Sequence, residues 1–91
     1  MVGKLAVSLA GHDKGSVFLI VREEAGSVYV ADGVLRHYAS PKKKNIKHIQ
    51  PVLQAGMGSE ELAALAENPA DADTKIKRCI RLYMEKINSR R

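Results

Sequence analysis

Five basic residues form the densest group of side chains with evident chemical use in this sequence. They lie within residues 36–48, a segment that contains no Asp or Glu: Arg36, Lys42, Lys43, Lys44 and Lys47. Three consecutive lysines in a loop cannot all face inward, so solvent or a polyanion is expected to surround them. Because no acid lies near them in the sequence, we interpret the segment as a phosphate-binding loop. The alternative is a solvated loop that only raises solubility.

A short loop bounded by glycines is the second candidate site. The segment Gly11-His12-Asp13-Lys14-Gly15 allows close backbone approach to a phosphate, and Lys14 adds a charge. The alternative is a hairpin whose glycines serve the turn alone. His12 and His48 are expected beside the basic surface, where an imidazole can donate to a phosphate or a ribose hydroxyl. An exposed imidazole without a specific role is an equally good interpretation of each.

The residues that could act as nucleophiles or metal ligands do not form a recognisable set. His12, His37, His48 and Cys79 show neither a C-x-x-C nor an H-x₃₋₅-H spacing. Cys79 lies on the apolar stripe of a predicted helix, where a cysteine is more often a small core residue than a nucleophile. No G-x-S-x-G motif is present. We therefore expect no enzyme activity, metal, cofactor or small-molecule substrate.

Composition limits the class of protein. Ninety-one residues, of which 45% are apolar, allow one modest core. Fifteen Lys and Arg against ten Asp and Glu give a net charge of +5, which favours a polyanionic partner. The single cysteine suits a reducing compartment. The longest apolar run, residues 17–21, is far shorter than the ~18 residues of a membrane helix. The N-terminal apolar stretch is also short for a signal peptide, so mature sequence and a cytoplasmic location are expected.

The first half of the chain is predicted to be β. Alternation at Leu5, Val7 and Leu9 indicates a half-buried strand, and apolar residues on both faces of 16–22 indicate a central one. Asp32-Gly33 predicts a two-residue turn, and Ser40-Pro41 is expected to interrupt the ladder. The remaining strands are predicted at residues 27–31, 34–36 and 45–50. Short strands at this spacing favour a small barrel.

The second half is predicted to be α. Residues 54–58 are expected to form a flexible joint, followed by a short helix at about 60–67 with Ser59 as its N-cap. Asn68-Pro69 should end it, and Asp71 or Asp73 should cap an amphipathic helix at about 73–88. The apolar stripe of this helix packs on the barrel or the short helix in one interpretation. In the other, the basic amphipathic helix docks RNA or a partner protein, the latter through Ile76, Ile80, Tyr83, Met84 and Ile87.

Charge is unevenly distributed along the chain. Residues 51–73 hold five acids and no Lys or Arg, whereas residues 74–91 hold seven Lys or Arg and a single acid, Glu85. The acidic middle is able to fold back on a basic segment and compete for it, and the sequence leaves this open.

The Gly11–Gly15 segment, set between two alternating strands, resembles the KOW motif of ribosomal proteins and elongation factors. Gly15 corresponds to the characteristic glycine, followed by the apolar positions Val17, Leu19 and Val21. The likeness extends to residues 31–36 and to the block 40–50. Residues 3–50 resemble the short bacterial KOW-domain RNA-binding proteins, relatives of KOW-bearing large-subunit ribosomal proteins of archaea and eukaryotes. The resemblance implies an SH3-like β-barrel that binds structured or ribosomal RNA without catalysis.

We therefore expect a mainly β protein with α: a KOW-type SH3-like barrel in residues 1–54 and a helical C-terminal extension in residues 55–91. The predicted function is non-catalytic, ribosome-associated RNA binding. Few aromatic rings are available, so shape and backbone should be recognised rather than stacked bases. The alternative is a protein-interaction module in a transcription or translation complex. The predicted RNA-binding residues are Lys14, Arg36, Lys42, Lys43, Lys44, Lys47, His48, His12 and Gly15.

Overall fold

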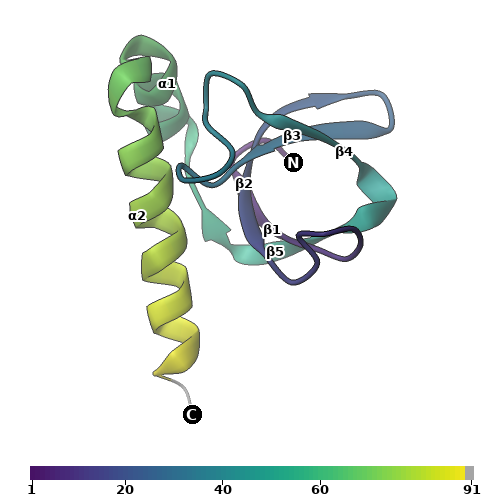
Figure 1. Cartoon of the computed structure of the whole chain (residues 1–91). Helices are drawn as coiled ribbons and strands as arrows, with labels where there is room; N and C mark the ends of the chain where they lie inside the picture. The colour runs from purple at the N-terminus through teal and green to yellow at the C-terminus, as the bar shows by residue number, and fades with distance from the viewer. Residues whose placement is uncertain (90–91) are drawn as a thin grey trace.

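In the computed structural model, which describes residues 1–89, five antiparallel strands form one sheet and two helices follow it (Figure 1). The elements are β1 (Lys4–Ser8), β2 (Val17–Glu24), β3 (Ser27–Ala31), β4 (Lys42–Asn45), the 3₁₀ turn η1 (Ile46–His48), β5 (Ile49–Gly56), α1 (Ser59–Glu67) and α2 (Pro69–Asn88). The predicted mixture of β followed by α is confirmed. The strand order is β4-β3-β2-β1-β5, so β4 and β5 are the edges of a sheet that hydrogen bonds do not close within the described chain.

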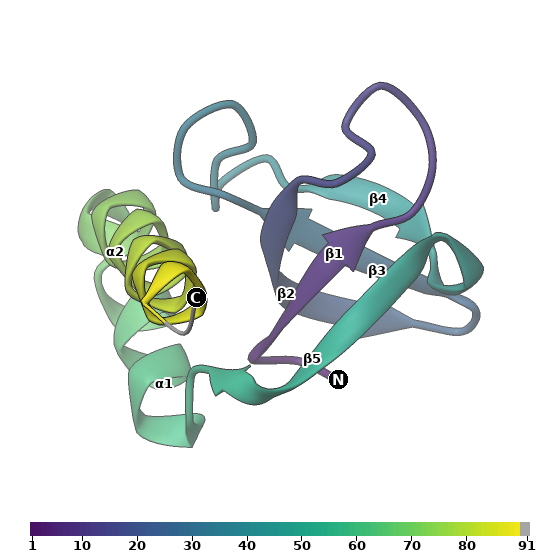
Figure 2. The same cartoon turned by 90° about the horizontal axis from the view of Figure 1, so that it is seen from below.

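Apolar residues on both faces of β2 explain why it lies inside the sheet. Phe18 and Ile20 pack into one core with Ala6, Val28, Val30 and Ile49, on the concave face around which the sheet curls (Figures 1 and 2). Leu19 belongs to a second core on the opposite face. Two buried faces require apolar residues at successive positions, as predicted for a central strand.

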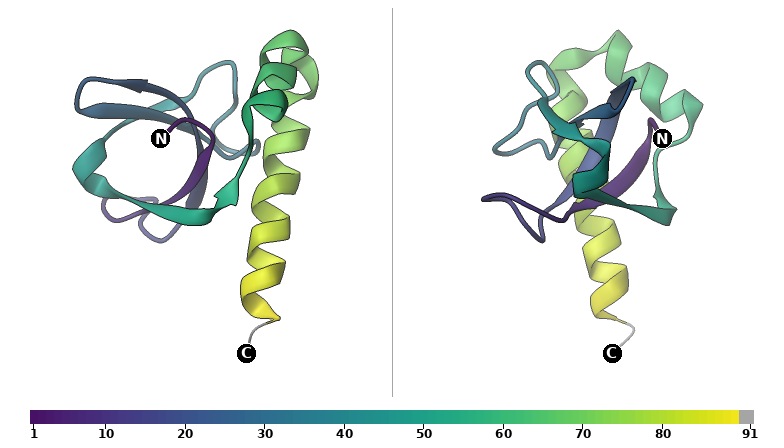
Figure 3. Two further views of the ribbon diagram at one scale, coloured as in Figure 1. Left: turned by 180° about the vertical axis from the view of Figure 1, so that it is seen from behind. Right: turned by 90° about the vertical axis from the view of Figure 1, so that its right-hand side faces the viewer.

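The second core joins the sheet to the helices. Leu5, Leu19 and Ala31 from the sheet pack with Leu65 of α1 and with Ala72 and Ile76 of α2. Ile76 is fully buried, Ile80 and Tyr83 are partly buried, and Met84 is 41% exposed. Figure 3 shows α2 beside the curled sheet in its left view and behind the sheet in its right view. The apolar stripe of α2 therefore packs on the sheet through its N-terminal part, whereas its C-terminal part stays more open.

Two predicted β segments are wrong. Residues 34–36 form no strand, because the Asp32 Oδ1 atom accepts hydrogen bonds from the N–H groups of Val34, Leu35 and Arg36 and folds the chain into a loop. This loop replaces the predicted two-residue turn. Residues 45–50 do not form one strand either. The Asn45 side chain accepts from the Lys47 N–H at 2.9 Å and starts η1.

The segment expected to be a joint and the helix starts also differ from prediction. β5 continues through residues 51–56, so only residues 57–58 separate the sheet from α1. The N-cap of α1 is Gly58, not Ser59. α2 begins at Pro69 rather than at residues 71–73, because a proline is tolerated in the first helical turn, where its missing N–H has no helical partner.

Candidate nucleic-acid interface

Asp13 lies at the centre of a charged cluster that joins the two predicted sites. Its Oδ1 atom accepts from Lys44 Nζ at 2.9 Å and from the Ser8 hydroxyl at 3.0 Å, and its Oδ2 atom accepts from Lys42 Nζ at 3.1 Å. The expectation that no acid neutralises the lysines is therefore wrong for Lys42 and Lys44. Their partner comes from the Gly11–Gly15 loop, which is distant in sequence but adjacent in the fold.

The three consecutive lysines belong to strand β4 rather than to a loop. Strand geometry places Lys42 and Lys44 on one face and Lys43 on the other. The Lys44 side chain is only 7% exposed, whereas Lys43 is exposed to solvent. The three lysines therefore differ in role: Lys42 and Lys44 belong to the Asp13 cluster, and Lys43 remains available to a ligand.

The Asp13 carboxyl is ionised in this environment. Its partial burial acts to raise the pKa, but hydrogen bonds from Lys44, Lys42 and Ser8, with the charge of Lys44, outweigh that effect. The pKa of Asp13 consequently lies well below its ordinary value of 3.8. The cluster is held by charge as well as by hydrogen bonds at neutral pH.

The Gly11–Gly15 loop has the backbone that its two glycines suggest. Gly11 and Gly15 have φ values of +85° and +89°, which residues other than glycine rarely adopt. The Gly15 N–H donates to the Ser8 carbonyl at 2.8 Å, which closes the loop. A Cβ atom at Gly15 would meet nothing within 4 Å, so the backbone there is open to a ligand.

Fastening this loop to β4 brings the two predicted segments together, with Lys43 on the face of β4 opposite the Asp13-bound lysines. The Leu9 N–H donates to the His48 carbonyl at 2.8 Å, so the base of the loop also contacts η1. The exposed basic residues of the Gly11–Gly15 loop, β4 and η1 are His12, Lys14, Lys43, Lys47 and His48. Within residues 1–89, none of them forms an ion pair. We refer to these five residues as the basic edge.

Arg36 is separated from this arrangement. It lies in the β3–β4 loop, and that loop is fastened to α2, since Asp73 accepts from the Tyr38 N–H at 2.7 Å and lies 2.8 Å from His37 Nδ1. Asp73 thus links the acidic middle of the chain to a loop residue, His37. The predicted group of five cations is consequently divided into an Asp13-bound pair, the two exposed lysines Lys43 and Lys47, and Arg36.

Sequence reasoning missed two cations of α2. Lys77 and Arg81 line a hollow of about 400 Å³ whose other wall includes Gly15 and Ser16. The excess of Lys and Arg in residues 74–91 was the available signal. Only the packing of α2 on the sheet decides which of those residues face the glycine loop.

A pair of residues on the outer face of the sheet was also missed. The Arg22 guanidinium lies 4.0 Å from the centre of the Tyr29 ring, and Lys43 is the register partner of Tyr29 on β4. The three form a row across β2, β3 and β4. The row depends on strand register, which no local pattern in the sequence specifies.

We also searched the described residues for a metal site and for a membrane-spanning helix. Among residues 1–89, no three His, Cys, Asp or Glu side chains are grouped so that they would hold a metal ion. The helices of this part of the chain are too short or too polar to cross a membrane. A scan against protein-family models finds no match, and a search of curated proteins finds none either.

Proposed function

We propose that this chain is a non-catalytic RNA-binding protein built on an SH3-like β-barrel of the KOW type. The strand order supports this architecture, because β4 and β5 are the two sheet edges and the three-residue η1 joins them directly. The curl of the sheet around one buried core is consistent with a barrel. The resemblance of residues 3–50 supplies the family and the structured, ribosomal class of RNA.

The observation that carries the proposal is the Asp13 cluster. By holding the glycine loop against β4, it places Lys14 and His12 beside the strand and turn that carry Lys43, Lys47 and His48. An RNA backbone would supply the anions that these exposed residues lack within residues 1–89.

Each group has a distinct part in this proposal. Lys14, Lys43 and Lys47 neutralise phosphates, and His12 and His48 donate to phosphate or 2′-hydroxyl oxygens. Lys42 and Lys44 are positioning residues that hold the loop. Lys77 and Arg81 extend the cationic surface past Gly15 toward α2. Arg36, in the β3–β4 loop, is a separate phosphate contact in this proposal. The protein then recognises the shape and charge of a folded RNA in the cytoplasm. In this proposal that RNA belongs to the ribosome.

Salt dependence of RNA binding tests this assignment. A labelled RNA hairpin is titrated by fluorescence anisotropy at several salt concentrations with the wild type and with the double variant Lys43→Ala, Lys47→Ala. Loss of two phosphate contacts should flatten the slope of log K against log salt by about 1.4–1.8.

The matched control is Lys75→Ala with Lys86→Ala, which removes the same charge from the α2 side that faces β5. The control should retain the wild-type slope. Equal flattening in both variants would mean that binding follows net charge alone. An unchanged slope in the first variant would remove the basic edge as the site.

A further inference from the structure

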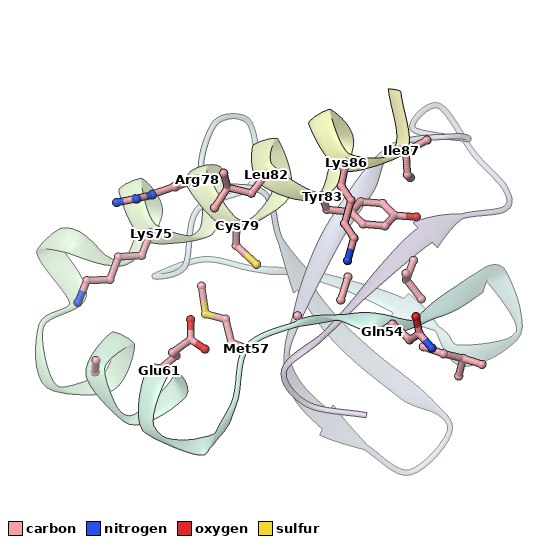
Figure 4. Close-up of a pocket in the computed structure, with 15 residues that line it drawn as sticks. Gln54, Met57, Glu61, Lys75, Arg78, Cys79, Leu82, Tyr83, Lys86 and Ile87 are labelled. Carbon is pink, nitrogen blue, oxygen red and sulfur yellow. The ribbon is translucent and has the colours of Figure 1, made fainter. Parts of the chain in front are cut away.

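A large groove lies between β5 and α2, away from the basic edge. Its volume is about 910 Å³, and Figure 4 shows lining residues of α2, such as Cys79 and Tyr83, with Met57 and Gln54 from the facing segment. The apolar lining includes Val52, Ala55, Met57, Cys79, Tyr83 and Ile87. Two further lining residues, Leu53 and Leu82, are 82% and 50% exposed. An apolar surface of this kind on a small domain is typical of a protein-binding site.

The strand wall of the groove carries backbone without a strand partner. Lys4 pairs with Gly56 and Ala6 with Pro51, so the four residues 52–55 lie opposite Leu5 alone. This bulge leaves these residues without register partners in β1. Pro51 has no N–H to donate, which confines any added strand to the part of β5 that follows it. Because β5 is an edge of the sheet, its outer side has no strand neighbour within the described residues, and an extended ligand is able to hydrogen-bond there along residues 52–56.

The helix wall carries uncompensated positive charge. Lys75, Arg78 and Lys86 line the groove from α2, and within residues 1–89 none of them forms an ion pair. The lining contains one carboxylate, Glu61, which accepts from the Gly58 N–H at 3.3 Å at the start of α1. The net charge of the groove favours an acidic ligand.

The helix wall sets the length of the site. Residues 75–87 of α2 cover roughly 18 Å at 1.5 Å per residue. An extended chain of about six residues, with a rise of about 3.3 Å per residue, spans the same distance. We propose that the groove binds an extended, acidic segment of a partner protein, about six residues long, with alternate apolar side chains entering the groove. This site is independent of the proposed RNA-binding edge.

Two synthetic peptides test this proposal on the full chain. The probe alternates leucine and glutamate over eight residues, and its control alternates leucine and lysine with the same apolar pattern. Binding is followed by fluorescence anisotropy and by chemical shifts of the ¹⁵N-labelled protein. The acidic peptide should shift the amides of residues 52–56 and of the groove side of α2, and the basic peptide should bind at least tenfold more weakly.

Charge reversal separates the groove from general attraction. The double variant Lys75→Glu, Lys86→Glu should bind the acidic peptide at least tenfold more weakly. The double variant Lys43→Glu, Lys47→Glu makes an equal change of charge on the basic edge and should bind the peptide like the wild type. Leu53→Asp, at a position already exposed to solvent, should weaken binding without affecting the fold.

Three outcomes would overturn the proposal. In the first, the acidic peptide leaves the groove amides unshifted. In the second, both charge reversals weaken it equally. In the third, the RNA hairpin shifts the groove amides and competes with the peptide, which would make the groove part of the RNA surface. Loss of RNA binding in the basic-edge variant alone would leave the groove proposal intact.

Discussion

The Asp13 carboxylate accepts a hydrogen bond of 2.9 Å from the Nζ atom of Lys44, a residue 31 positions later in the sequence. The Lys44 side chain is only 7% exposed. Lys44 lies opposite Val28, a fully buried residue of the concave core. An ammonium group at such a position is costly without a partner. The loop that would contact RNA is therefore also the element that makes a lysine tolerable in β4.

Replacing Asp13 should destabilise the protein. Asp13→Asn removes the charge that pairs with Lys42 and Lys44, and we expect the free energy of unfolding to fall by about 2–3 kcal/mol. Chemical denaturation measures this change. Glu67→Ala, at an exposed acid at the end of α1, serves as the control and should stay within about 0.5 kcal/mol of the wild type. Equal stability of the two variants would contradict a structural role for Asp13.

The ion pairs of Asp13 with Lys42 and Lys44 should make an acid-sensitive contribution to the stability of the fold. The folded pKa of Asp13 lies below its ordinary value of 3.8, so its contribution is fully present above that pH and is lost as the pH falls below it. The difference in unfolding free energy between the wild type and Asp13→Asn should be constant from neutral pH to about pH 5 and should shrink below about pH 4. Denaturation curves across this range measure it. A difference that does not shrink at all between about pH 5 and about pH 2 would argue against the ion pairs.

Lys43 and Lys44 should give opposite results despite being neighbours. Lys43→Met should flatten the salt slope of RNA binding by about 0.7–0.9 and leave stability unchanged. Lys44→Met should keep the slope but lower the free energy of unfolding by about 1–2 kcal/mol, because Asp13 loses a buried partner. Anisotropy titrations and denaturation on both variants separate the two roles. A lower slope in Lys44→Met would return that lysine to the phosphate-binding set.

Two glycines with similar φ values should differ in their tolerance of a side chain. Gly15→Ala, at φ +89° with open space around it, should cost about 1–2 kcal/mol of backbone strain alone. Gly33→Ala, at φ +81°, should cost more, because its Cβ would meet the Asp73 carbonyl and displace the loop from α2. Denaturation of both variants compares them. A larger loss at Gly15 would contradict the packing of the loop on α2.

Cys79 should react slowly with alkylating reagents. Burial and, to a smaller extent, the Glu61 carboxylate raise the pKa of this thiol, which lowers the fraction of reactive thiolate. Alkylation at about pH 8 should be several-fold slower in the folded chain than in urea, and slower again with the acidic peptide bound, since Cys79 lines the groove. Mass spectrometry gives the rates. Equal rates with and without the peptide would argue against occupation of the groove.

Local patterns in the sequence located most of the elements but not their boundaries. Alternation and two-sided apolarity indicated β1, β2 and β3, and the spacing of Ile76, Ile80 and Ile87 indicated α2. The segment around Asp32 was predicted as a turn followed by a strand, because Asp32-Gly33 is a typical turn pair and Val34 and Leu35 are apolar residues that suit a strand. Three hydrogen bonds to one carboxylate oxygen override that preference.

The candidate site was predictable only in part. Clustering of cations and the paired glycines singled out two segments, and the structure brings those two segments together. The role of Asp13 was not predictable, because its contacts with Lys42 and Lys44 span 29 and 31 residues and depend on where the loop folds. The groove was equally hidden, since it exists only where the bulge of β5 meets α2.

The shared core of Leu5, Leu19, Leu65 and Ile76 makes the sheet and the helices thermodynamically interdependent. A ligand that holds α2 against β5 must therefore stabilise the whole folded state, the distant basic edge included, to an extent that grows with ligand concentration. Thermal shift of the unlabelled protein thus becomes a general screen for occupants of the groove. The melting temperature would register a partner segment of any sequence, even one that has yet to be identified.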